Sequence, residues 1–148
     1  MEERKMLALV DNIISIKPLF FKTLGKPIPM NSNITPGAYY AMLNLFNCES
    51  LSMSELGKML MISKPNVTAI INKLIVKGLV LRASAKPDRR IIMIRLSAKG
   101  YKFVETNNKK YLDQVTKKIM FLKDDELELF SVSLQNVKDI LLKMPTLR

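Results

Sequence analysis

Polar and basic side chains suited to binding a nucleic acid gather between positions 63 and 90. Within a predicted helix over 63–77, the apolar residues Val67, Ile70, Ile71 and Leu74 follow the spacing of one buried helix face. The opposite face carries small, hydroxyl, amide and basic side chains: Ser63, Lys64, Pro65, Asn66, Thr68, Ala69, Asn72 and Lys73. Such a face suits the major groove of DNA, where Asn can read adenine and Thr can reach a base or a phosphate. An ordinary solvated helix face is the alternative.

A basic loop follows this helix. Two β-prone runs, 79–84 and 91–97, predict a β-hairpin. The six residues between them form a basic tip that contains Lys86, Arg89 and Arg90. Arginines at the end of a hairpin can enter a narrow minor groove. Asp88 can pair with a neighbouring arginine and so stabilise the shape of this wing, and a basic surface turn without a ligand is the alternative.

The positive charge of the chain is concentrated in its middle third. The whole chain carries 24 Lys and Arg against 13 Asp and Glu, a formal charge of +11. Residues 51–100 hold ten of the basic residues and only Glu55 and Asp88 as acids, so this third contributes +8. Concentrated positive charge indicates a polyanionic partner, and double-stranded DNA fits the predicted helix and hairpin best. On charge alone, an acidic membrane surface or simple solvation are the alternatives.

The composition excludes several classes of function. The chain has no His, which removes His-dependent catalytic triads and the commonest metal ligand. A glycine-rich phosphate loop and paired catalytic carboxylates are also missing from the sequence, so we predict no enzyme activity, no cofactor and no metal site. With Cys48 as the single cysteine, no intrachain disulfide can form, and we expect a reducing, cytoplasmic setting. Cys48 has no basic neighbour that would favour a reactive thiolate, which indicates a buried or incidental thiol.

We predict no membrane segment. The N-terminus is mixed in charge, unlike a signal peptide. Residues 27–48 are uncharged, but the three prolines among them are incompatible with a continuous apolar helix.

The scaffold that positions the polar residues is predicted to be mainly α (α+β). Helices over 52–60 and 63–77, joined by two residues, form a helix-turn-helix, and the hairpin behind them supplies a wing. The winged helix-turn-helix lobe is therefore placed at 35–97 within a single domain of 1–148. Its boundaries rest on Thr35 before Pro36 at a helix start, the capping box of Ser52 and Glu55, Ser63 as a helix cap, and Gly78 at a helix end.

The flanking segments are predicted to be long helices. They cover 3–22, where Pro18 should kink or end the helix, 97–119 and 124–143. In the last helix, apolar residues recur at spacings of 3, 4, 3 and 4, the pattern of a helix that packs along another helix. These residues are Leu127, Phe130, Leu134, Val137 and Leu141. We therefore predict a homodimer, with 1–24 and 98–148 as its helical dimerisation region.

The sequence resembles the MarR (multiple-antibiotic-resistance regulator) family of winged-helix repressors. The resemblance rests on Ser52-x-x-Glu55-Leu56-Gly57 and Ile62-Ser63-x-Pro65-x-Val67-Thr68. It is most specific in Lys77-Gly78-Leu79-Val80-x-Arg82, Asp88-Arg89-Arg90 and Leu96-Ser97-x-x-Gly100. The long flanking helices fit the layout of this family, so the resemblance covers nearly the whole chain.

The resemblance implies a homodimeric transcriptional repressor that binds a pseudo-palindromic operator and is released by a small ligand. Relatives often carry a basic residue directly after the Val-Thr pair, where this chain has Ala69. The operator cannot be transferred from relatives for this reason, and Asn66, Thr68 and Asn72 are expected to carry more of the readout. A winged-helix module for architectural DNA coating or for protein contact is the alternative function.

An apolar or aromatic effector is expected from the composition of the joint between the first two helices. Aromatic and Met side chains gather there, although core packing explains each of them and none is assigned as a ligand residue. These residues are Phe20, Phe21, Met30, Tyr39 and Tyr40.

Overall fold

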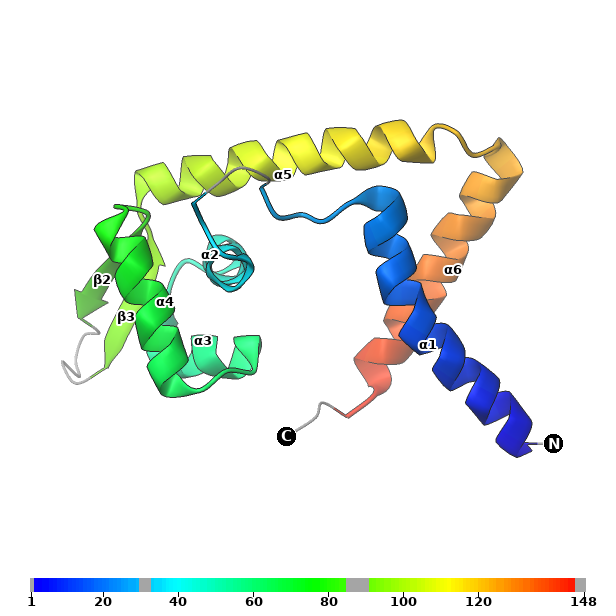
Figure 1. Ribbon diagram of the computed structural model, residues 1–148, viewed down its shortest axis with the longest axis horizontal. Helices are drawn as coiled ribbons and strands as arrows, with labels where there is room; N and C mark the ends of the chain where they lie inside the picture. Colours follow the sequence, from blue (N-terminus) through cyan, green and yellow to red (C-terminus); the bar gives the residue numbers. More distant parts are fainter. Residues whose placement is uncertain (1, 30–32, 85–90, 146–148) are drawn as a thin grey trace. The chain divides into compact units, whose positions relative to one another are not determined.

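A computed structural model describes residues 2–29, 33–84 and 91–145 of the chain. The described residues form six helices and a small three-stranded antiparallel sheet, so the predicted mainly helical fold with a β wing is confirmed (Figure 1). The chain divides into two compact units, Lys26–Tyr111 and Met1–Gly25 with Leu112–Arg148. We call the first the central unit and the second the terminal unit. The central unit extends beyond the predicted lobe of 35–97 and includes the first part of a long helix.

The central unit holds most of the elements. In chain order they are α2 (Pro36–Asn47), β1 (Leu51–Ser52), α3 (Met53–Leu60), α4 (Lys64–Val76), β2 (Val80–Ser84), β3 (Ile92–Leu96) and the start of α5 (Ala98–Ile119). Side chains from α2, α3, α4, the sheet and the start of α5 meet in one apolar core. Its most deeply buried members are Tyr39, Ala41, Met42, Leu56, Val67, Ile71, Leu74, Val80, Ile94 and Val104.

The predicted starts of α2 and α3 are confirmed. The Thr35 side chain accepts a hydrogen bond from the backbone N–H of Ala38 at 3.4 Å, with Pro36 in the first turn. At α3, the hydroxyl of Ser52 accepts from the backbone N–H of Glu55 at 3.2 Å, and the Glu55 carboxylate accepts from the backbone N–H of Ser52 at 2.7 Å. Both orphan amides of the helix start are therefore satisfied within the capping box.

The turn between α3 and α4 is tight because Met61 adopts a left-handed backbone conformation and Gly57 has no side chain. Met61 has a φ of 53°, in the left-handed region, and the backbone N–H of Ile62 donates to the carbonyl of Gly57 at 3.1 Å. A Cβ at Gly57 would lie 3.2 Å from Cγ2 of Val67, so the absence of a side chain lets α3 pack closely on α4.

A second junction joins the end of α4 to the start of α5. Gly78 ends α4 with a φ of 68°, as predicted. The Ser97 hydroxyl donates to the carbonyl of Gly78 at 2.6 Å and accepts from the backbone N–H of Gly100 at 3.0 Å. A Cβ at Gly100 would lie 2.0 Å from the carbonyl oxygen of Leu79, so only glycine fits where α5 meets this turn. The position of α4 is thus tied to the long helix.

The sheet contains one strand more than the sequence predicts. Its order is β1-β3-β2, with Leu51 opposite Ile94 and Arg82 also opposite Ile94 from the other side. The two-residue β1 is too short for periodicity to reveal. The tip between β2 and β3 lies outside the described residues.

The terminal unit consists of α1 (Glu2–Leu24), the end of α5 and α6 (Asp124–Lys143). The predicted helix over 3–22 is present as α1, and of the two alternatives at Pro18, a kink or an end, the helix does not end there but continues to Leu24. Tertiary contacts hold this last part: Phe20 stacks on Phe130 with ring centroids 6.3 Å apart, and Gln114 Nε2 donates to the carbonyl of Leu24 at 2.9 Å. These contacts compensate for the backbone bond that a proline removes.

No single helix among the described residues is long and apolar enough to cross a membrane, and only α3 with α4, a pair bent by 108°, passes that test on combined length and composition.

Candidate DNA-binding surface

The two sides of α4 differ sharply in burial. Val67, Ile71 and Leu74 are at most 1% exposed and anchor the helix in the core. The opposite side faces solvent. Its exposed residues are Lys64, Pro65, Asn66, Ala69, Asn72 and Lys73, with Ser63 exposed just before the helix and Thr68 half-buried. The residues of this helix that were selected from the sequence for DNA contact therefore lie on one side of α4, here called the α4 face.

The α4 face begins at a helix start that lacks a side-chain cap. Ser63 occupies the N-cap position with extended backbone, but its hydroxyl makes no capping hydrogen bond. The prediction of Ser63 as a cap is right in position and wrong in hydrogen bonding. Because Pro65 lacks an N–H, fewer amides need a partner at this end than at α3. The N–H groups that remain, with the helix dipole, favour an anion such as a phosphate.

Thr68 and Asn72 already have hydrogen-bond partners. The Thr68 hydroxyl donates to the carbonyl of Lys64 at 3.0 Å, within its own helix. The Asn72 carbonyl oxygen accepts a hydrogen bond from a guanidinium N–H of Arg82 on β2. Asn66 remains an exposed amide near the start of α4. The three polar side chains expected to read bases are thus not equivalent.

Arg82 is a residue of this surface that sequence reasoning missed as a site residue. A usable signal exists in strand alternation: Arg82 lies two positions after Val80, a fully buried residue, and opposite Ile94, also fully buried. Residues two apart share a face of a strand, so Arg82 lies on the face of the sheet that packs against the core. At the edge of that core its guanidinium reaches the exposed side of α4.

The predicted wing residues Lys86, Asp88, Arg89 and Arg90 lie outside the described residues. The strands that lead to this tip carry two further exposed cations, Arg82 and Arg95. Glu55 is the described acid of residues 51–100, and a hydrogen bond from the Ser52 backbone lowers its pKa. Its charge is therefore committed to the cap of α3, while the basic residues around α4 stay exposed.

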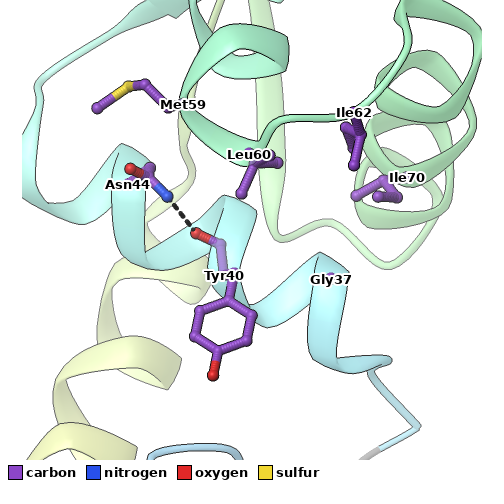
Figure 2. Close-up of a pocket in the computed structure, with 7 residues that line it drawn as sticks. All are labelled: Gly37, Tyr40, Asn44, Met59, Leu60, Ile62 and Ile70. Carbon is purple, nitrogen blue, oxygen red and sulfur yellow. Dashed lines mark hydrogen bonds between the residues drawn. The ribbon is translucent and has the colours of Figure 1, made fainter. Parts of the chain in front are cut away.

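A pocket lies beside the helix-turn-helix. It has a volume of about 320 Å³ and is bounded by α2, α3, the connection and α4 (Figure 2). Most of its lining is apolar, and the Asn44 side chain is turned back onto its own helix by a 2.8 Å bond to the carbonyl of Tyr40. The lining residues are Gly37, Tyr40, Asn44, Met59, Leu60, Ile62 and Ile70.

Of the aromatic and Met residues expected around an effector, one lines this pocket. That residue is Tyr40. Tyr39 is fully buried in the core, its hydroxyl bonds Asn108 at 3.3 Å, and burial raises its pKa. Phe20 and Phe21 belong to the terminal unit, and Met30 lies outside the described residues.

The predicted dimerisation residues lie on α6, where no described residue is fully buried. Phe130 is half-buried against Phe20, whereas the other four are exposed, from 38% for Leu134 to 58% for Leu141. Leu127 and Val137 fall within this range. The part of the chain that the structure describes contains no group of three His, Cys, Asp or Glu side chains that could hold a metal ion.

Comparisons with known proteins match this geometry. The model of the MarR family matches residues 34–92, which span α2 to the start of β3. The HTH-type transcriptional regulator PrsX of Escherichia coli is 33% identical over 104 residues, covering 67% of this chain and 61% of that protein. The chain spans about half to three-fifths of the length of the curated relatives it matches.

Solved structures show the same fold over almost the whole chain. A MarR family protein from Bacillus stearothermophilus has a TM-score of 0.79 at 22% identity and covers 97% of this chain and 99% of its own. Streptococcus pneumoniae FabT in complex with DNA has a TM-score of 0.68 at 19% identity, covering 97% of this chain and 96% of its own. Residues 34–92, which include the helix-turn-helix, therefore belong to the MarR family of winged helix-turn-helix transcriptional regulators, a family without enzymatic activity, and the flanking helices share the fold of its solved members.

Proposed function

We propose that this chain is a sequence-specific DNA-binding regulator that inserts α4 into the major groove. The observation that carries the proposal is that α4 is amphipathic. Its apolar side is buried in the core, and its polar side is exposed. The basic excess of the middle third supplies attraction to phosphates. Arg89 and Arg90 belong to the proposal as wing contacts in the minor groove, on the basis of their place in the sequence.

Selection from a library of synthetic duplexes with about 20 randomised base pairs tests this function. We expect a pseudo-palindrome whose half-sites lie about one helical turn apart. Asn66→Ala should relax the preference at one base pair by about 1–3 kcal/mol. Arg90→Ala should instead weaken binding to every sequence and lower the salt slope by about one.

Lys138→Ala, which removes one charge from α6, is the matched control and should leave both preference and salt slope unchanged. Equal binding to all duplexes would contradict sequence-specific recognition and would favour an architectural DNA coat. No binding to any duplex would favour a protein-interaction module.

A dimer is the second part of the proposal. Neither α1 nor α6 contains a buried residue within the described chain, although both are rich in apolar side chains. Ile14 is 67% exposed and Leu142 is 75% exposed. Apolar surface of this extent on two long helices favours burial against a second copy of the chain. Sedimentation should give a dimer at micromolar concentration, and a stable monomer would contradict this part.

Release by a small apolar or aromatic molecule is the third part. The pocket beside α4 is within the size range of small-molecule sites and is mostly apolar. It is bounded by α2 on one side and by both helices of the helix-turn-helix on the other, so an occupant can act only through a different affinity for two positions of α4. Tenfold weaker DNA binding requires about 1.4 kcal/mol of coupling.

Titration of aromatic acids such as salicylate, and of neutral aromatic metabolites, into a preformed protein–DNA complex tests this third part. Ile70→Gln should reduce the effect of an active compound while leaving DNA binding intact in its absence. If no compound of a broad panel changes DNA affinity, the chain is a constitutive DNA binder.

A further inference from the structure

The pair formed by Asn72 and Arg82 carries an inference about what the α4 face recognises. Asn72 lies on the exposed side of α4, and Arg82 lies ten residues further along the chain on β2. A guanidinium N–H of Arg82 donates to the carbonyl oxygen of Asn72. Both side chains are exposed, so the pair lies at the surface and not in the core.

The hydrogen bond fixes which end of the Asn72 amide is available. An asparagine that reads adenine accepts from the adenine N6 amino group with its oxygen and donates to N7 with its nitrogen. In this structure the oxygen faces a guanidinium, which carries only donors. The amide nitrogen is then directed away from Arg82, because its N–H groups would be repelled by those of the arginine.

An adenine edge would bring its amino group toward the same guanidinium, donor against donor. Guanine, by contrast, presents two acceptors in the major groove, O6 and N7, and a phosphate presents acceptor oxygens only. The positive charge of Arg82 favours both of these acceptor groups further.

We propose that Arg82 is a positioning residue that converts Asn72 from an adenine reader into a hydrogen-bond donor, so that the pair binds acceptor groups of DNA: a guanine edge or a phosphate. The inference rests on the proposed DNA-binding function and deepens it. It also narrows, for Asn72, the general expectation from sequence that an asparagine on this helix face can read adenine.

The test compares full-length wild type with Asn72→Ala, Arg82→Met and the double variant, using the randomised duplex library and then the selected duplex. Arg82→Met keeps the length of the side chain but removes its donors. Arg95→Met is the matched control, because Arg95 is exposed on the neighbouring strand, opposite Leu81, and lies on the other face of the sheet.

If the acceptor is a guanine, Asn72→Ala removes a guanine preference at one base pair of each half-site, by about tenfold. Arg82→Met then admits adenine at that same base pair. If the acceptor is a phosphate, both variants weaken all sequences alike and lower the salt slope by about one. In either case the two substitutions are non-additive in a double-mutant cycle, whereas Asn72→Ala and Arg95→Met are additive.

Arg82→Lys supplies a second check, because lysine keeps the charge but lacks the planar fork. Compared with Arg82→Met, the Arg82→Lys variant should recover more of the overall DNA affinity than of the preference at the guanine base pair. Thermal unfolding of each variant verifies that the fold is kept.

Three results would overturn the inference while leaving the proposed function in place. The first is an adenine preference of the wild type at the base pair that Asn72→Ala relaxes. The second is no change in preference or affinity in either single variant, and the third is additivity of the two. A wild type that binds no duplex overturns both the proposed function and this inference.

Discussion

The central and terminal units use their apolar residues in opposite ways. In the central unit, side chains from four helices and a sheet converge on one core, and residues such as Met42, Leu56 and Ile71 are fully buried. In the terminal unit, α1 and α6 have no buried residue, even though Phe20 and Phe130 stack on each other. One region is therefore stabilised within the chain, whereas the other leaves exposed the apolar surface that the proposed dimer would bury.

Charged substitutions at the exposed apolar residues of α6 should have the largest effect, and they should affect the terminal unit while leaving the central unit intact. The double substitution Leu127→Asp with Leu134→Asp places two charges where we propose a dimer contact. We expect a monomer by sedimentation and a loss of more than about a hundredfold in affinity for the selected duplex, because two linked half-sites no longer bind together. The central unit should keep its fold, since neither residue belongs to that unit.

Asn136→Asp is the matched control on the same helix, at an exposed polar position outside the predicted seam. It should leave the dimer intact. A double variant that stays dimeric would remove the predicted role of the α6 residues.

Truncation of a buried residue of α4 should lower the stability of the central unit, because it leaves a cavity in the core. Leu74 is 1% exposed, and Leu74→Ala should cost about 2–5 kcal/mol of unfolding free energy through lost burial and a cavity. Val76→Ala, at a residue 87% exposed, should cost less than about 0.5 kcal/mol. Urea unfolding followed by circular dichroism measures both.

Ile14→Ala on α1 sharpens this comparison. If the terminal unit is stabilised by a second copy of the chain, the loss of unfolding free energy in Ile14→Ala should depend on protein concentration. The loss in Leu74→Ala should persist at every concentration. The same concentration dependence for both variants would mean that the two units are stabilised in the same way.

The local features of the central unit could be predicted from the sequence, because each depends on a few adjacent residues. The capping box of Ser52 and Glu55 and the helix end at Gly78 need no distant partner, and both are present in the structure. Apolar periodicity likewise assigned Val67, Ile70, Ile71 and Leu74 to the buried side of α4; three of them are buried, and Ile70 is half-buried and lines the pocket.

The features that sequence reasoning missed depend on residues far apart in the chain. The two-residue β1 exists because β3 offers it a partner, and the part of α1 that follows Pro18 is contacted by Gln114 and Phe130, two residues that periodicity does not connect to it. Arg82 was absent from the predicted site because its partner on α4 is set by the packing of helix on sheet. Periodicity reports burial, and it does not report which exposed groups meet.

The two glycines at the junction of α4 and α5 should respond differently to a methyl group. Gly100→Ala places a Cβ 2.0 Å from the carbonyl oxygen of Leu79, so the start of α5 must move; we expect a cost of about 1–3 kcal/mol. Gly78→Ala meets no atom within 4 Å, and its cost, about 1–2 kcal/mol, comes from a φ of 68° alone.

Chemical denaturation combined with DNA affinity distinguishes these two causes. Gly100→Ala should also weaken DNA binding, because α4 is tied to α5 through this junction, whereas Gly78→Asn should recover part of the stability lost in Gly78→Ala, since Asn tolerates the left-handed region. Equal effects of both substitutions on DNA binding would argue against a role of the junction in positioning α4.

The smallest expected effect compares the two helix starts of the helix-turn-helix. Ser52→Ala removes a capping hydrogen bond and should cost about 1 kcal/mol, whereas Ser63→Ala removes none and should leave stability nearly unchanged.

The cap of α3 also brings a pH dependence. The pKa of Glu55 is lowered from 4.5 in the folded chain, first by the Ser52 backbone bond, so its stabilising effect is fully present above that value. The effect is lost as pH falls through the lower folded pKa, when the carboxylate takes up a proton. Unfolding of wild type and Glu55→Gln between pH 3 and pH 6 should therefore converge at the acid end and diverge above it, by a small amount because the group is exposed. A difference that stays constant across this range would show that the Glu55 charge does not contribute to the cap.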